Sequence, residues 1–276
     1  MPFLLLTPTE SMQRRAFLAT LVPPSAAALA QAAGKRPILR RAWLGEADRR
    51  HGHDALGTGS YPGSLHALVE HEGQLTAVRL DLPADAAFED GLVRRVDLSG
   101  RGSDDIVLVA SSRLAGAAIV VYGVELHGTR PVLRERARSE AVGRGRWLNP
   151  VGFGDFDGDG RLEVVSVSTP HIGGVLTLYR YQPPHLVTLA KTGNVSNHAY
   201  GQQEQRLAAV RKRHGRVAVA IPDQSRYRVR TLSVAKDGGW EAVEADVMFE
   251  SPIDRITPTG ASRLEVLAGA ERRLLP

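Results

Sequence analysis

Four acidic residues lie close together in one glycine-containing segment near the middle of the chain. Asp155, Asp157, Asp159 and Glu163 occupy positions 1, 3, 5 and 9 of the segment DFDGDGRLE. Two like charges about 5 Å apart repel by roughly 3 kcal/mol at an effective dielectric of about 20, and several such pairs converge here. A hard cation removes that repulsion, and calcium accepts oxygen ligands in a flexible geometry. The spacing therefore predicts a calcium loop.

The predicted ligands are the side-chain oxygens of these four acids and the main-chain carbonyl of Arg161 at position 7. Gly158 and Gly160 allow the positive φ angles that curl a loop around an ion. An EF-hand begins in the same way, but it closes with a glutamate at position 12 and is flanked by helices. Position 12 here is Ser166, and both flanks have the pattern of strands. The alternative is an ordinary acidic turn, solvated and empty.

One known family shares this loop. The stretch Gly154–Val167 (GDFDGDGRLEVVSV) resembles the calcium loop of FG-GAP/VCBS repeats, the blade repeats of integrin-like β-propellers. In those repeats the loop lies between neighbouring strands of one blade. The wider stretch Arg146–Gly174 also resembles bacterial secreted proteins of this class, whose biochemical role is generally unassigned. The resemblance implies a fold and an ion, and hardly any activity.

A second segment superposes on the acidic loop with an offset of 58 residues. Val96–Val109 (VDLSGRGSDDIVLV) keeps the acids at positions 1 and 9, but Ser99 and Arg101 replace Asp157 and Asp159. We expect the Arg101 guanidinium to take the place of the ion, so this loop is predicted to be metal-free.

Apolar runs with alternating polarity and short turns follow both loops and recur more weakly on either side. The expected strands are 65–70, 74–82, 105–110, 117–125, 131–136, 163–168, 175–182, 186–190, 216–222, 227–234 and 264–269. Self-similarity at a period of about 50 residues indicates a repeat architecture. We predict an all-β fold, a β-propeller-like array of about four to five blades of three to four antiparallel strands. A small five-bladed ring and an open or irregular array both fit, and a β-sandwich with coincidental turns is the alternative.

Residues 1–33 have the features of an export signal. Met12–Ala33 combines paired arginines, a short apolar run and an A-x-A ending at Ala28–Ala30. Gln13–Leu18 resembles the twin-arginine pattern without its usual Ser or Thr, and Sec export is the alternative. A buried amphipathic helix fits poorly with the paired prolines, and Met12 is a possible start. We expect a protein of the periplasm or the extracellular space.

Residues 34–276 are expected to form a single, monomeric domain. The chain has no cysteine, so its fold uses no disulfide. Past residue 33 no stretch approaches the ~18–20 apolar residues of a membrane span. Leaving out Arg14, Arg15 and Glu10 reduces the formal charge from +5 to +4. Extracellular calcium would stabilise such a domain by mass action.

One basic cluster stands out, Arg211–Arg216 (RKRHGR). Such a cluster could bind anionic polysaccharide, lipid or nucleic acid. It occupies the position that the acidic loop has in the other repeats, but it lacks the acidic ligands, which favours a solvated turn. No aromatic residues are interleaved with it, so we expect no nucleic-acid partner.

The catalytic candidates are few. His51–Asp54 (HGHD) has a metal-like composition, but its glycine-rich polar surroundings favour a flexible solvated segment. His171, His198, Trp147 and Asn149 could converge at one end of the array, or could be turn and packing residues. The familiar hydrolase and phosphate-binding motifs are absent from the sequence. We therefore expect a non-enzymatic binding or scaffold module with an unknown protein or carbohydrate partner; the alternative is a periplasmic hydrolase or lyase.

Overall fold

The computed structural model describes residues 36–260 and 262–276. The expected export signal, residues 1–33, lies outside them. Within the described residues the secondary structure is entirely β, with 55% in strands and no helix. Consequently, in this part of the chain no helix is long and apolar enough to cross a membrane. Pro37–Pro276 form one compact unit, and the predicted all-β fold is confirmed.

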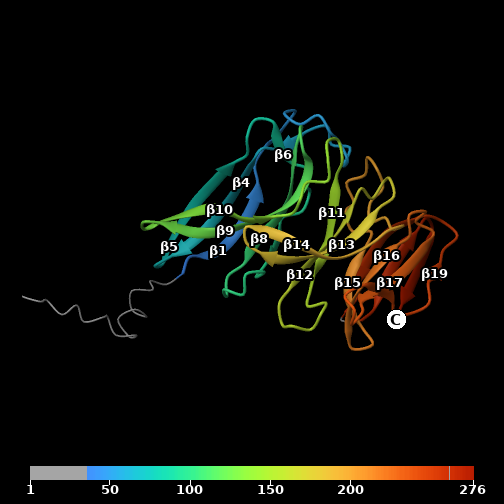
Figure 1. Cartoon of the computed structure of the whole chain (residues 1–276). Helices are drawn as coiled ribbons and strands as arrows, with labels where there is room; N and C mark the ends of the chain where they lie inside the picture. The colour runs from blue at the N-terminus through green and yellow to red at the C-terminus, as the bar shows by residue number, and fades with distance from the viewer. Residues whose placement is uncertain (1–35, 261) are drawn as a thin grey trace, which may run out of the picture. The chain divides into compact units, whose positions relative to one another are not determined.

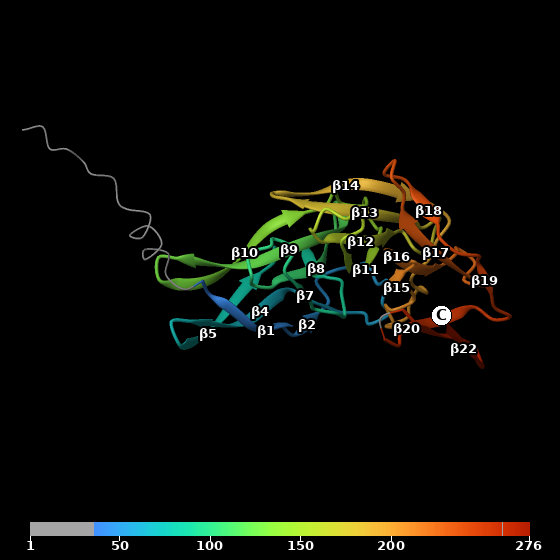
Figure 2. The same ribbon diagram turned by 90° about the horizontal axis from the view of Figure 1, so that it is seen from below.

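Five antiparallel meanders follow one another along the chain, from blue to red in Figure 1 and Figure 2. The first meander contains β1 (Ile38–Leu44), β4 (Ser64–His71) and β5 (Gln74–Asp81). The second contains β6 (Ala86–Phe88), β7 (Arg94–Val96), β8 (Asp105–Ser112), β9 (Gly116–His127) and β10 (Arg130–Arg138). The third contains β11 (Leu148–Gly154), β12 (Glu163–Ser168), β13 (Val175–Gln182) and β14 (His185–Thr192). The fourth contains β15 (Ala209–Arg213), β16 (Arg216–Pro222), β17 (Arg228–Val234), β18 (Trp240–Ala242) and β19 (Val247–Met248). The fifth contains β20 (Ile253–Pro258), β21 (Leu264–Ala268) and β22 (Glu271–Leu275), and a separate ribbon pairs β2 (Ala47–Asp48) with β3 (Tyr61–Pro62).

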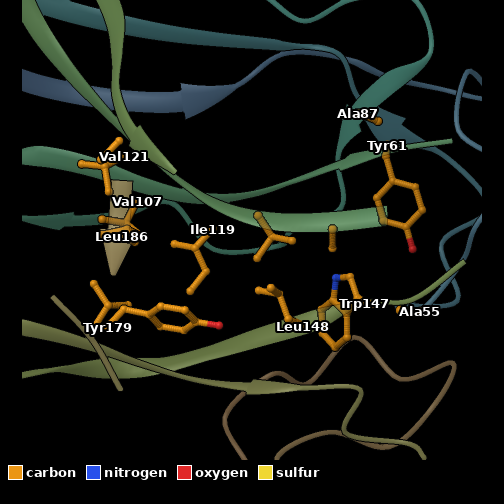
Figure 3. Close-up of a cluster of buried hydrophobic side chains, with 14 of the residues drawn as sticks. Ala55, Tyr61, Ala87, Val107, Ile119, Val121, Trp147, Leu148, Tyr179 and Leu186 are labelled. Atoms are coloured by element: carbon orange, nitrogen blue, oxygen red, sulfur yellow. The ribbon is translucent and has the colours of Figure 1, made fainter. Parts of the chain in front are cut away.

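The second and third meanders are joined into one nine-stranded sheet by a single parallel bridge between Arg138 and His185. This sheet is a curled half-barrel. An apolar cluster fills the space between its two halves, with Tyr61 and Trp147 at one end and Val121 and Leu186 at the other (Figure 3). Because the sheet is curled, its two halves face each other and enclose a hydrophobic core, as two separate sheets do in a β-sandwich.

Strand β8 shows why its sequence is an almost unbroken apolar run. Successive side chains of a strand point to opposite faces of its sheet. Ile106 and Leu108 are buried against the first meander, whereas Val107 and Val109 are buried against the third. A strand covered on both faces needs apolar residues at every position, so strict alternation is lost.

Four hydrophobic clusters connect the meanders in chain order: first to second, second to third, third to fourth and fourth to fifth. Burial of each Val, Leu or Ile side chain contributes about 1.5–3 kcal/mol, so these clusters are the main source of stability. Over residues 36–260 and 262–276, none of the four clusters combines the first meander with the fifth.

The sequence favours a solvated turn for the basic cluster Arg211–Arg216 in the fourth meander, and the structure corrects this prediction. Arg211–Arg213 lie within strand β15, and the turn is confined to His214 and Gly215, with φ angles of 48° and 75°. Arg211 is buried and donates to Thr231 Oγ1 at 3.1 Å and to Glu244. Its guanidinium ties β15 to β17 and the segment after β18, so it is not part of a solvated turn.

Candidate functional site

The acidic loop joins β11 to β12, two antiparallel neighbours. Gly158 and Gly160 have φ angles of 79° and 84°, as the sequence predicts. The Asp155 carboxylate holds the curl, because it accepts hydrogen bonds from the amides of Gly158 (2.7 Å) and Gly160 (3.0 Å). The segment therefore curls on its own backbone contacts before any ion is considered.

The structure brings together three of the four predicted carboxylates. Asp155, Asp157 and Asp159 each place one oxygen within 4.8 Å of the others. The fourth, Glu163, is fully buried and faces the loop backbone, where its Oε2 accepts from the Phe156 amide at 2.9 Å. Glu163 thus binds the end of the loop to its beginning through the Phe156 amide. Burial raises the pKa of the Glu163 carboxyl.

Two arginine side chains lie against these acids. Arg180, on β13, contacts Asp157, lies 3.0 Å from Glu163 Oε1 and 3.4 Å from Asp159 Oδ2. Arg161, whose carbonyl is the predicted ligand, pairs its side chain with Asp159 at 2.6 Å and lowers the pKa of that carboxyl. Four carboxylates and two guanidinium groups leave a formal charge of −2 (−4 and +2), the charge that one divalent cation neutralises.

The loop at residues 97–105 joins β7 to β8 and is built in the same way. Asp97 accepts from the amides of Arg101 (3.0 Å) and Gly102 (2.7 Å). Asp105 is fully buried, and the guanidinium of Arg136 from β10 reaches it at 2.7 Å. The cation on this closing acid is therefore Arg136, a strand residue from further along the chain that the sequence alone does not single out.

A groove of about 1600 Å³ runs beside the acidic loop. One wall is the loop itself, from Phe153 to Gly158, and the other is formed by the β15–β16 hairpin and the residues after β17. The second wall carries the cationic side chains of Lys212, Arg216 and Lys236 and the acids Asp237 and Glu241. Glu241 pairs with Arg216 at 2.6 Å. The second wall is therefore mixed in charge, whereas the charged residues of the loop wall are all acids.

A second group of polar residues lies at the Trp147 end of the nine-stranded sheet. This histidine centre consists of His51, His53, Glu89, Trp147, His171 and His198. Its first part corrects the sequence prediction for residues 51–54. The side chain of His51 is only 3% exposed and that of His53 is 22% exposed, so this segment is packed and not solvated.

Glu89 organises the first part of the histidine centre. Its buried carboxylate accepts from the Ala55 amide at 3.0 Å, from Ser111 Oγ at 2.8 Å and from His53 Nδ1 at 2.6 Å. Burial alone would raise the pKa of Glu89, but the imidazoles of His51 and His53 and the Ala55 amide outweigh it and lower the pKa to about 2. Glu89 is therefore an anion held in the interior.

Trp147 connects the two parts of the centre. Its indole Nε1 donates to the Glu89 carbonyl at 2.9 Å. Its ring stacks on His171, with centroids 5.9 Å apart and planes 3° from parallel, and meets His198 edge-on at 4.7 Å. Three of the four residues that the sequence offered as a loop-end site therefore do meet.

The hydrogen bonds of the two histidines fix their tautomers. His198 Nε2 lies 2.7 Å from the Gln202 carbonyl, which can only accept, so Nε2 carries the proton. Nδ1 of neutral His198 must then accept from His171 Nε2, 2.7 Å away. His171 Nδ1 is left as an unprotonated acceptor, and burial lowers the pKa of His171 to about 4.

Asn149, the fourth of these residues, is not in ring contact with Trp147, His171 and His198. It is fully buried, and its amide donates to the carbonyls of Gln205 (2.9 Å) and Asn197 (3.2 Å), while Asn197 donates back to the Asn149 carbonyl at 2.9 Å. These bonds tie β11 to the connection between the third and fourth meanders. Asn149 is therefore a residue that positions the chain around His198.

Sequence reasoning missed Glu89, Arg180, Arg136 and Gln205. Glu89 directly follows the buried apolar residues Ala86–Phe88, and an acid in that position is the one signal that could have marked it. The others carry no local signal, since each acts on a partner at least 17 residues away.

No protein-family model matches this chain, and no curated protein matches it. The two sites are therefore interpreted from their own geometry.

Proposed function

We propose that this protein is an exported binding or scaffold module of the FG-GAP/VCBS class, stabilised by calcium in the loop of residues 155–163. One observation carries the proposal. Three carboxylate oxygens converge within 4.8 Å in a loop that two positive-φ glycines curl between antiparallel strands. Oxygen-rich sites of this kind suit calcium rather than a softer metal.

The arrangement of the meanders supports a propeller-like array. Each of the five packs face to face on its neighbours in chain order, as blades do. The equivalent loops at 97–105 and 155–163 each join two antiparallel strands of one meander, which supports an internal repeat. In this proposal the array is open between its first and last members.

The role of the ion is structural. Its side-chain ligands come from one short loop, and its two positive charges compensate the two negative charges that remain after Arg161 and Arg180 are counted. On binding, Arg180 releases Asp157 and keeps its contact with buried Glu163. Calcium thereby holds β11 to β12 and orders one wall of the adjacent groove.

Binding is proposed to occur in that groove, and the partner is a protein or a carbohydrate. The groove is large enough for a peptide or an oligosaccharide, and its walls offer both acidic and basic hydrogen-bonding groups. Export by the twin-arginine or Sec route fits this role, because calcium is abundant outside the cytosol and stabilises whatever state binds it.

The test uses two matched substitutions. Asp155→Asn and Asp97→Asn each alter an aspartate that accepts two amides of its own loop, so they disturb the backbone equally. Calcium at about 100 times its dissociation constant should stabilise the unmodified protein by about 2.7 kcal/mol, a melting-temperature rise of roughly 5–10 °C. Asp155→Asn should abolish the rise and Asp97→Asn should keep it, as measured by calorimetry with calcium and with chelator. Loss of the rise in both variants, or its persistence in both, would contradict the assignment.

A second candidate, a periplasmic hydrolase or lyase, is favoured by the hydrogen-bonded chain from the Gln202 carbonyl through His198 to His171. A carbonyl orients one imidazole, which orients the next, as in hydrolytic triads. A pKa of about 4 makes His171 a weak base at neutral pH, which places this candidate second. His171→Gln should then abolish hydrolysis in a screen of ester, phosphoester and glycoside substrates without lowering calcium-dependent stability.

A further inference from the structure

His51, His53 and Glu89 lie far from the acidic loop and form a cluster of a different chemical kind. One donor atom of each residue lies within 4.8 Å of the other two. Imidazole nitrogen with a carboxylate suits ions of the zinc class, whereas calcium takes oxygen ligands. Two histidines and one acid are a common set for such ions, and they leave a coordination position open.

His51 supplies an observation that is independent of this composition. Its side chain is 3% exposed, yet neither of its ring nitrogens makes a hydrogen bond to any described residue. Buried polar groups normally have partners, and an exception requires a reason such as a missing ion. The imidazole nevertheless points at the carboxylate, with Nε2 3.4 Å from Glu89 Oε2.

That separation fits two ligands of one ion. Metal–ligand distances of about 2.0–2.2 Å in a tetrahedron place neighbouring ligand atoms about 3.3–3.6 Å apart. His53 Nδ1 is closer, 2.6 Å from Glu89 Oε1, because a proton now bridges the two atoms. Replacing the proton by an ion requires a movement of roughly 0.7 Å, which the partly exposed His53 beside Gly52 can make.

Glu89 is already held as a ligand should be. Ser111 Oγ and the Ala55 amide donate to its two oxygens, so the carboxylate is fixed before an ion arrives. Such outer hydrogen bonds orient metal ligands and contribute to affinity. We propose that His51, His53 and Glu89 bind one divalent metal ion of the zinc class.

The open side of this site has a defined chemistry. His51 and His53 line a cavity of about 290 Å³ together with Arg113, Arg144 and Arg146. A divalent ion with one carboxylate keeps a net positive charge, and the three guanidinium groups add to it. The ligand that completes the coordination is therefore a small oxyanion, a phosphate or a carboxylate, or else water.

The experiment uses the full chain stripped of metal and loaded with Co²⁺ or Zn²⁺ in excess calcium, which occupies the acidic loop. We expect one Co²⁺ per chain with the visible bands of a four- or five-coordinate ion, and competition by Zn²⁺ in calorimetric titration. His51→Leu loses only the 3.4 Å approach to Glu89, which keeps its hydrogen bonds from Ala55, Ser111 and His53. His53→Gln changes a partly exposed side chain, so both variants should fold. Each should weaken Zn²⁺ binding by about 100-fold or more, since loss of even an outer-shell partner costs 10–100-fold.

His185→Gln, at an exposed hairpin turn of the third meander, is the control for surface histidines and should bind Zn²⁺ as the unmodified protein does. Binding that is equal in His51→Leu and the unmodified protein, or no binding at all, would overturn the metal site. Asp155→Asn should leave Zn²⁺ binding unchanged, so failure here is distinct from failure of the calcium loop. Inorganic phosphate, compared with chloride at equal ionic strength, should shift the Co²⁺ bands; an unchanged spectrum would overturn the oxyanion ligand.

Discussion

At the scale of single residues, the arginines decide the electrostatics of this protein as much as the acids do. Arg180 lies among the carboxylates of the acidic loop, and Arg136 lies on the buried acid of the equivalent loop. Both come from strands rather than from the loops they neutralise. The negative charge of a loop can therefore be counted from its own sequence. The part of that charge that arginines from distant strands neutralise cannot.

The histidine pair predicts a pH dependence of stability. Burial and the neighbouring His198 lower the pKa of His171 to about 4, whereas an unfolded histidine has a pKa of about 6.5. Between these values the unfolded state binds more protons, so the stabilisation is complete above pH 6.5 and is lost as the pH falls towards 4. His171→Phe keeps the aromatic contact with Trp147 but cannot titrate.

We expect the loss of unfolding free energy between pH 7 and pH 5 to be smaller in His171→Phe by roughly 1–2 kcal/mol, a value reduced for partial exposure. Urea denaturation at the two pH values, with a chelator present, measures it. An identical loss in both proteins would show that His171 is protonated equally in the folded and unfolded states.

At the scale of elements, the second meander depends on one buried ion pair. Arg136 on β10 reaches Asp105 at the start of β8, and both side chains are almost inaccessible to solvent. Removing one partner of a buried pair leaves an uncompensated charge inside the protein. The pair is therefore the contact that fixes the β7–β8 loop against β10.

Arg136→Leu is expected to lower the unfolding free energy by about 3–5 kcal/mol. Arg138→Leu, on the same strand, breaks a largely exposed pair with Glu135 and should cost no more than about 1 kcal/mol. Chemical denaturation of the two variants gives the comparison. Equal costs would mean that Asp105 finds another partner when Arg136 is lost.

At the scale of the whole molecule, burial is greatest in the middle of the array. Strands β8 and β9 contribute side chains to two clusters, whereas the fifth meander contributes to only one. In arrays whose units contact only their neighbours, stability is a sum of units and interfaces, so an end unit opens more easily.

Hydrogen exchange should follow that gradient. We expect amides of β21 to exchange faster than those of β9, and Leu264→Ala to accelerate exchange in residues 253–275 while leaving residues 116–127 unchanged. The cavity left at the fully buried Leu264 lowers the free energy of unfolding by about 2–5 kcal/mol. We expect this destabilisation to be confined to the fifth meander. Exchange followed by mass spectrometry tests this, and a uniform acceleration would indicate one cooperative unit.

Much of the strand pattern was predictable from the sequence, because it depends on local periodicity. The runs at 175–182 and 216–222 coincide with β13 and β16. β11 is expected from the sequence only as a strand-like flank of the acidic loop, without bounds, because Pro150, Gly152 and Gly154 weaken its strand character; its pairing with β12 defines it. Propensity is a weaker guide than a neighbouring strand.

The amino-acid sequence by itself determined the all-β fold and the curl of the acidic loop, since both follow from spacings of a few residues. Only the tertiary structure decided that His51 is buried beside Glu89, that Trp147 lies against His171 and His198, and that Arg180 lies among the loop acids. These contacts depend on which faces of the meanders meet, and residues that meet across a packed interface need no particular separation along the chain.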